Sequence, residues 1–257
     1  IRNTFRFILG NLRDNFEPQK IENLKLEQYS ELDRFILNRL FIINDSIKHN
    51  LKEYNFHKIY KDLLNFCTLD LSSFYFDIRK DVLYCDSLNS KKRKDCIVIL
   101  NVILDCLLKW FAPIFVFTTE EIYHLVTKSE ASVHELHFPK IPNSWKNDSL
   151  DLKWKNLFKI KQEANIAIEK KRANKEIGSS LEANIKIFTN TNDYNLLEGL
   201  DLAEYFITSQ AEKFKNKKED DEIKIEVKKA EGKKCPRCWK IFENNCQRCD
   251  DVLKGKI

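Results

Sequence analysis

The sequence predicts a mainly α-helical protein, in which an antiparallel helical bundle is followed by a small mixed α/β module and a zinc knuckle. Only five glycines and five prolines occur among the 257 residues, which favours long helices over a fold of many turns. Apolar residues recur at helical spacing through most of the chain up to Trp145. Close to the end, four cysteines form two CxxC pairs, a spacing typical of zinc sites. A hydrophobic content of 43% is enough to bury a sizeable core in a chain of this length.

Four apolar stripes at helical spacing define the expected bundle. They lie at Phe5–Leu12, Leu32–Leu51, Phe56–Tyr84 and Ile97–Phe111. The first has no capping residue before it, so we expect a helix cut from something larger. The last is apolar on nearly all sides, so we expect it to be the central helix and to stop near Pro113. Thr118 and Glu121 have the spacing of a capping box, which predicts a shorter helix through Val126.

Beyond Trp145 the pattern changes to a mixture of helix and strand. Leu152–Lys175 predicts a helix, and short apolar runs predict strands at Ile185–Ile187, Tyr205–Thr208 and Ile223–Val227. The highly charged stretch Lys213–Glu222 is expected to be a hairpin tip or a linker. We therefore expect three parts: a helical domain over residues 1–146, an α/β module over 147–227 and a zinc-binding tail over 228–257.

The two CxxC pairs predict a structural metal site. Their four members are Cys235, Cys238, Cys246 and Cys249. Two residues between cysteines allow a tight turn to point both sulfurs at one centre, and two such turns complete a tetrahedral site, for which one zinc ion is the first choice. Iron in a rubredoxin-like site and a pair of disulfides are the alternatives. Because cysteine fills every ligand position, no open position is left for water, and we expect the metal to fold the tail without doing chemistry.

The tail also carries the excess positive charge of the chain. Lys228–Ile257 holds nine Lys/Arg and four Asp/Glu, a surplus of five that equals the net charge of +5 of the whole sequence. Trp239 follows the second cysteine directly, with Arg237 and Arg248 inside the two CxxC pairs. A flat aromatic ring flanked by guanidinium groups can stack on and grip an unpaired base of RNA. Packing of Trp239 against the back of the knuckle is the alternative.

A second basic cluster, Lys91–Lys94, lies at the predicted start of the central helix, where the helix dipole disfavours cations. Contacts with phosphate groups of a nucleic acid would stabilise these residues, and Lys92 and Arg93 are our candidates for such contacts. Solvation, or pairing with nearby acids, is the alternative.

Other sequence features bound the class of protein. No apolar run approaches the roughly 18 residues that a membrane span needs. The remaining cysteines follow no ligand spacing, and we expect them to be buried small hydrophobic residues in a reducing cytoplasm. They are Cys67, Cys85, Cys96 and Cys106.

Five segments carry a resemblance to a known family. In chain order they read RNTFRFILGNL, LDLSSFYFDIRKDVLYCD, FAPIFVFTTEEIY, EKKRANKEIGSSLEANIKI and KCPRCWK. Together they span essentially the whole chain and resemble the carboxy-terminal part of bacterial-type isoleucyl-tRNA synthetases. The first three resemble segments shared with valyl- and leucyl-tRNA synthetases, whereas GSSLEA followed by CPRCW points to the isoleucine enzymes. The spacer between the two cysteine pairs is short, and we expect it to be longer in many members of this family, which puts any contact from the missing loop in doubt.

The resemblance implies a class I synthetase anticodon-binding domain and a zinc-bearing tail that helps to hold the anticodon loop of isoleucine tRNA. Arg237 and Trp239 carry over as anticodon contacts. The full-length enzyme would be an isoleucine–tRNA ligase that uses ATP in the cytoplasm. The His-x-Gly-His and Lys-Met-Ser-Lys elements of class I catalysis do not occur in the sequence, so we expect this chain to lack catalytic and editing sites. We also expect a monomer without a membrane partner.

Two interpretations from other classes of protein remain at this point. One is a free-standing zinc-ribbon nucleic-acid-binding protein. The other is a structural adaptor that uses zinc only for stability.

Overall fold

The computed structural model describes residues 1–12, 16–17, 21–216 and 222–255, and these divide into two compact units. The first unit comprises Ile1–Arg79 and Leu88–Asn147. The second comprises Lys80–Ser87 and Asp148–Ile257. The predicted class, mainly α with a small α/β module, is confirmed.

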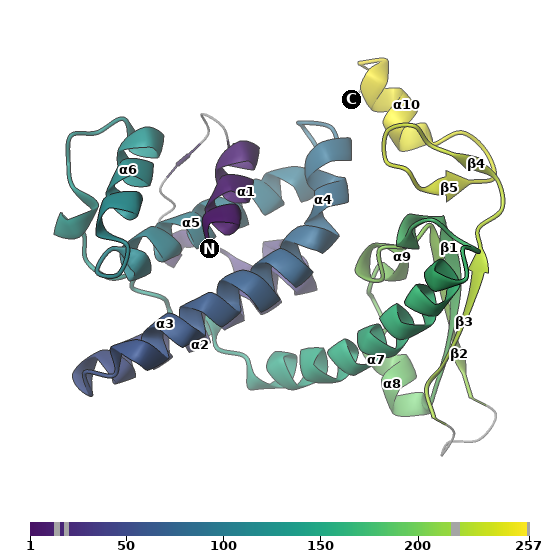
Figure 1. Ribbon diagram of the computed structural model, residues 1–257, viewed down its shortest axis with the longest axis horizontal. Helices are drawn as coiled ribbons and strands as arrows, with labels where there is room; N and C mark the ends of the chain where they lie inside the picture. Colours follow the sequence, from purple (N-terminus) through teal and green to yellow (C-terminus); the bar gives the residue numbers. More distant parts are fainter. Residues whose placement is uncertain (13–15, 18–20, 217–221, 256–257) are drawn as a thin grey trace. The chain divides into compact units, whose positions relative to one another are not determined.

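The first unit is a helical bundle (Figure 1). Its helices are α1 (Arg2–Leu12), α2 (Glu31–Lys52), α3 (Phe56–Asn65), the first residues of α4 (Phe76–Cys85), α5 (Lys91–Phe111) and α6 (Val116–Thr127). Short 3-10 turns lie at Ile21–Asn23, Leu26–Gln28, Val133–Glu135 and Asn143–Trp145. A π-helical segment, η3 (Phe66–Tyr75), joins α3 to α4, so the single predicted stripe from Phe56 is helical throughout but changes its pitch.

Helix α5 forms the centre of the bundle, as predicted. Its buried side chains face in all directions, and it contacts α1, α2 and α6. Even its polar Asn101 is buried, and the side-chain oxygen of Asn101 accepts a hydrogen bond from the Glu17 backbone N–H at 3.0 Å. The helix ends at Phe111, because Pro113 cannot continue it.

A buried ionic network joins α4 to the start of α2. Arg79 is only 1% exposed, and its Nη2 donates to Asp33 Oδ1 at 2.8 Å and to Ser30 Oγ at 2.6 Å. The hydroxyl of Tyr75 donates to the same Asp33 oxygen at 2.8 Å. Ser30 also caps α2 by accepting from the Asp33 backbone N–H. Each charged group in this network is therefore compensated within the core.

The second unit is built on a three-stranded sheet with the order β2-β1-β3. Its strands are β1 (Ala183–Thr189), β2 (Gln210–Lys215) and β3 (Lys224–Lys229). β1 pairs in parallel with β2 and antiparallel with β3. Alternate residues of β1 are buried, and α7 (Asp148–Ala173), α8 (Thr191–Leu196) and α9 (Leu202–Tyr205) contact the strands (Figure 1). The remaining elements are the 3-10 turn η6 (Ser180–Glu182), the hairpin β4 (Lys233–Lys234) and β5 (Ile241–Phe242), and α10 (Gln247–Leu253).

The capping box predicted at Thr118 and Glu121 is wrong. Helix α6 begins at Val116, and Phe115 occupies the capping position without a side-chain hydrogen bond. Thr118 therefore lies inside the first turn of the helix. The chain leaves α5 and re-enters a helix within four residues, so the turn around Pro113 sets the start of α6 and no polar side chain is needed there.

The strand predicted at Tyr205–Thr208 is also wrong. Asp201 caps α9 by accepting from the Glu204 backbone N–H at 3.0 Å, so Tyr205 is helical. Ile207 then has a φ of 57°, which interrupts the chain before a strand begins at Gln210. The charged stretch from Lys213 accordingly starts inside β2, and residues 217–221 of the predicted hairpin tip lie outside the described residues.

The helices of the described residues are too short or too polar to cross a membrane.

Candidate metal centre and nucleic-acid interface

The last part of the second unit folds as a knuckle around the four predicted cysteines. Cys235 and Cys238 lie on the turn between β4 and β5, Cys246 is the residue directly before α10, and Cys249 lies in the first turn of that helix. The backbone N–H of Trp239 donates to the Cys235 carbonyl at 3.0 Å and closes the first turn. Gly232, with a φ of 123°, precedes the hairpin, and a Cβ at this position would lie 2.1 Å from the Phe242 carbonyl oxygen. The hairpin can therefore close only with glycine there.

The four sulfur atoms are close enough to share one metal ion. They lie within 4.8 Å of one another, and Cys238 Sγ is 3.9 Å from Cys246 Sγ. Thiolates at about 2.3 Å from a zinc ion in a tetrahedral arrangement would lie about 3.8 Å apart. All four side chains are buried, and all eight cysteines of the chain are free of disulfides. The donor set fits a soft cation bound for structure.

Two cysteines of this cluster, Cys235 and Cys246, differ in how readily they ionise. Burial opposes ionisation of Cys235, but backbone N–H groups of Cys238 and Arg237 directed at its sulfur bring its pKa down to about 7. Burial raises the pKa of Cys246. The backbone N–H of Cys249 opposes this increase, and the Cys249 side chain adds to it. Four crowded thiolates repel one another, so a divalent cation at their centre supplies the missing positive charge.

Trp239 is presented to solvent rather than packed behind the knuckle. The residue is 60% exposed, whereas Trp110, Trp145 and Trp154 are at most 2% exposed. Its φ is 64°, a left-handed conformation that a bulky residue rarely adopts. This backbone conformation occurs directly after Cys238, so the metal turn itself sets the direction in which the indole ring leaves the surface.

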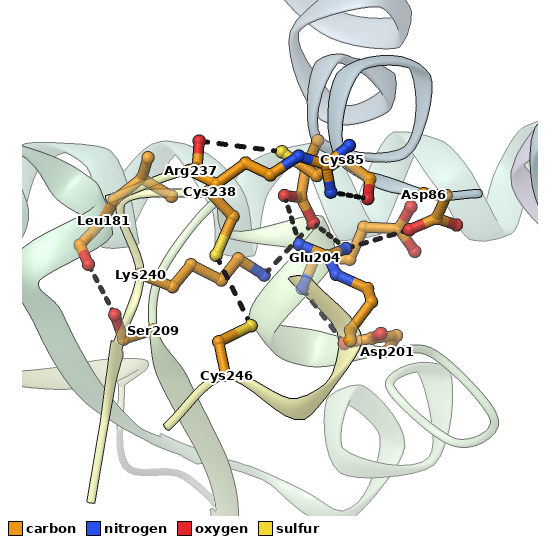
Figure 2. A network of polar contacts seen from close by, with 12 residues as sticks. Cys85, Asp86, Leu181, Asp201, Glu204, Ser209, Arg237, Cys238, Lys240 and Cys246 are labelled. Carbon is orange, nitrogen blue, oxygen red and sulfur yellow. Dashed lines mark hydrogen bonds and ion pairs between the residues drawn. The ribbon is translucent and has the colours of Figure 1, made fainter. Parts of the chain in front are cut away.

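The two arginines of the CxxC pairs contact protein groups of the same unit. Arg248 makes a two-pronged ion pair with Asp81, with both nitrogen–oxygen distances at 2.8 Å, and a third contact with Asp86 at 3.0 Å. Arg237 donates to the backbone carbonyl of Cys85 (Figure 2). It also donates to the carbonyl of Tyr84 at 3.1 Å. Burial alone would raise the pKa of Asp81, but hydrogen bonding and attraction from Arg248, with attraction from Lys240, outweigh it and lower that pKa.

The knuckle is also attached to the α/β module. The Ile241 backbone N–H donates to Ser209 Oγ at 2.6 Å. Ser209 in turn donates to the Leu181 carbonyl (Figure 2). Lys234 pairs with Glu182 at 2.9 Å.

The other two predicted RNA contacts, Lys92 and Arg93, lie in the first turn of α5 in the helical unit. Both are half-buried, and each has an interaction within the protein. Their neighbour Lys91 donates to the Gln28 carbonyl at 2.8 Å and pairs with Asp95, so pairing within the chain accounts for part of the basic cluster.

Sequence reasoning missed the partners of the knuckle on the last turn of α4. Cys85 is buried together with the four metal-site cysteines, and Phe242 packs against this group. Asp81 and Asp86 bind an arginine more than 160 positions away in the chain. The acids on either side of Cys85 are visible in the sequence, but nothing local indicates which cations they meet.

The fold and the site define the class of protein by three features: a helical bundle, an α/β module, and a four-cysteine knuckle that could hold a metal ion and exposes Trp239. Residues 33–187 match the family described as the anticodon-binding domain of tRNA ligase, and the chain belongs to this family. This membership does not favour a free-standing zinc ribbon or a structural adaptor.

Several curated proteins that resemble the chain carry the same name, isoleucine–tRNA ligase. The chain is 52% identical over 251 residues to isoleucine–tRNA ligase of Pelagibacter ubique, covering 98% of this chain and 28% of the relative. It is 38% identical over 252 residues to the ligase of the same name from Agrobacterium fabrum, covering 94% and 25%. A third relative of that name, from Natranaerobius thermophilus, is 35% identical over 276 residues, covering 99% and 30%. The resemblance to bacterial isoleucyl-tRNA synthetases is confirmed, and the chain spans less than a third of the length of these relatives.

Proposed function

We propose that this chain recognises the anticodon loop of isoleucine tRNA within an isoleucine–tRNA ligase. The whole enzyme would attach isoleucine to that tRNA with ATP, as a monomer in the cytoplasm. The part described here would bind RNA and leave the chemistry to the rest of the enzyme.

The exposed ring of Trp239 is the observation that carries this proposal. A bulky residue in the left-handed region costs free energy. Such strained residues persist where the surrounding structure fixes them, and they cluster at functional sites. Here the left-handed conformation places a 60% exposed indole on a cysteine-rich turn. Proteins that read single-stranded RNA loops stack unpaired bases on such aromatic rings. Membership of the anticodon-binding family makes an anticodon base the natural stacking partner.

The metal in this proposal is zinc, held by Cys235, Cys238, Cys246 and Cys249. When bound, it would supply folding free energy to a segment with few apolar residues of its own. The chain's own groups do the rest: the β4–β5 hairpin and α10 bring the sulfurs together, and the turn at Cys238 directs Trp239 outward.

Lys92 and Arg93 would add contacts to the RNA backbone. Contacts of this kind raise affinity for any tRNA without reading its sequence. Replacing either residue with alanine should weaken binding to matched and altered anticodons alike. Each substitution should reduce the slope of log affinity against log salt concentration by about one.

The test compares Trp239→Ala with Trp239→Phe. The probe is an RNA hairpin with the anticodon stem-loop of isoleucine tRNA, titrated at fixed salt beside a hairpin with an altered anticodon. Loss of stacking in Trp239→Ala should cost roughly 1–3 kcal/mol and narrow the preference for the isoleucine anticodon. Trp239→Phe keeps an aromatic face and should retain most of the affinity. Unchanged discrimination by Trp239→Ala, with the metal in place, would remove this residue from the recognition site.

A further inference from the structure

We infer that Arg237 and Arg248 are positioning residues, which fix the metal knuckle on the last turn of α4 and thereby set where Trp239 is presented to RNA. This inference rests on the proposed function and changes the role predicted for both arginines. Instead of gripping the RNA, they would act through Trp239. We call the set of Arg237, Arg248, Asp81, Asp86 and the last turn of α4 the knuckle latch.

The end of α4 carries negatively charged and hydrogen-bond-accepting groups that nearby cations stabilise. Asp81 and Asp86 lie close to the C-terminus of the helix, where the helix dipole disfavours negative charge. Carbonyl groups in the last turn of a helix can also accept hydrogen bonds from donors outside the helix. The knuckle supplies cations to both: Arg248 binds the two carboxylates, Arg237 binds the carbonyls of Tyr84 and Cys85, and Lys240 lies 3.9 Å from Asp81.

The geometry of Arg248 favours attachment over RNA binding. Its guanidinium forms a two-pronged pair with one carboxylate and contacts a second, and its side chain is only 34% exposed. Two carboxylates already offset the positive charge of Arg248, so its electrostatic attraction for a phosphate group of RNA is weak. A planar two-pronged pair also fixes orientation, which a lysine could not do in the same way.

The latch and the metal turn share a backbone segment. Arg237 lies between Cys235 and Cys238, and its carbonyl accepts a hydrogen bond from the Cys85 thiol at 3.8 Å (Figure 2). Trp239 is two residues further along. A shift of the knuckle on α4 would therefore displace the ring directly, whereas the ring itself makes no part of the latch.

The experiment uses Arg248→Met, Asp81→Asn and the double variant in the 257-residue chain. Lys254→Met, directly after α10, and Glu243→Gln on the knuckle are matched controls for the two changes of charge, since both side chains are exposed and lie outside the latch. Each protein is titrated with the isoleucine anticodon hairpin and an altered hairpin over a range of salt. Zinc release to a chelator is measured on the same samples without RNA.

We expect Arg248→Met and Asp81→Asn each to weaken binding to the isoleucine hairpin about tenfold and to reduce discrimination, with zinc still bound and the salt dependence unchanged. The double variant should be no weaker than Arg248→Met alone, because the contact that Asp81→Asn removes is already lost when Arg248 is replaced. Arg248→Lys should restore only part of the affinity. Zinc release should quicken in the single variants and stay unchanged in the controls.

A direct RNA contact would give the opposite pattern and overturn the inference. Arg248→Met would then lower the salt dependence by about one. Asp81→Asn would leave binding unchanged or strengthen it by freeing the guanidinium. If the wild-type chain binds neither hairpin, the proposed function fails, and unchanged zinc release in both single variants would show separately that the latch does not hold the knuckle.

Discussion

Replacing Trp239 with glycine and with alanine separates two roles of this position: stacking of the ring on RNA, and the left-handed backbone conformation of the knuckle. Both variants lose the indole ring, and they differ only in how readily the backbone adopts a φ of 64°. We therefore expect both to bind the anticodon hairpin equally poorly, whereas the glycine variant should hold its metal more firmly than the alanine variant.

The size of the difference follows from the backbone conformation. A residue with a Cβ pays about 1–2 kcal/mol in the left-handed region, and glycine avoids this cost. Glycine also adds about 0.4–1 kcal/mol of conformational freedom to the unfolded chain, which offsets part of the gain. The glycine variant should therefore favour the folded knuckle by roughly 0.5–1 kcal/mol over the alanine variant, a two- to fivefold difference in the folding equilibrium.

The assay is competition for zinc with a chelator of known affinity, followed on each variant with the RNA titration alongside. The other three tryptophans are buried. Quenching of tryptophan fluorescence by acrylamide in the unmodified protein therefore reports mainly on Trp239, which gives a second signal. Equal zinc retention in the two variants would show that the left-handed backbone carries no strain. Recovery of RNA affinity in the glycine variant would show that the ring is not a stacking partner.

Three further predictions concern the metal, the core and one histidine. Cys235→Ser or Cys249→Ser should abolish tight zinc binding while preserving the helical circular dichroism of the bundle, and loss of all helicity would contradict this. Asp33→Ala leaves Arg79 buried without its carboxylate and should lower the free energy of unfolding by about 3–5 kcal/mol, measured by urea denaturation. The Ser129 carbonyl and Glu120 raise the pKa of His124, so this interaction stabilises the fold below pH 6.5 and is lost as the pH rises through the raised value. NMR titration should give a lower pKa for His124 in the Glu120→Gln variant than in the unmodified protein. An unchanged pKa would disprove the pairing of His124 with Glu120.

The helices could be predicted from sequence because their signal is local. In an α-helix, residues three and four positions apart share a face, so the apolar stripes of α1, α2 and α5 indicate both the helix and the side that is buried. The predictions failed where tertiary context outweighed a short pattern. Tyr205 and Phe206 are both buried although they are neighbours in sequence, because they belong to the end of a helix and the turn after it. Two consecutive buried residues cannot both lie on one face of a strand.

The cysteine spacing alone determined the candidate metal ligands, because each pair lies within one turn and only the meeting of two turns was left to the fold. The spacing also placed Trp239 beside the site, but its exposure and left-handed backbone were decided by the folded knuckle. The partners of Arg237 and Arg248 were decided by tertiary structure alone. They lie more than 150 positions earlier in the chain, and a charged side chain near a metal site is suited equally to a phosphate and to a carboxylate. Which of these it meets depends on what packing brings within about 3 Å, a distance that no local pattern of residues encodes.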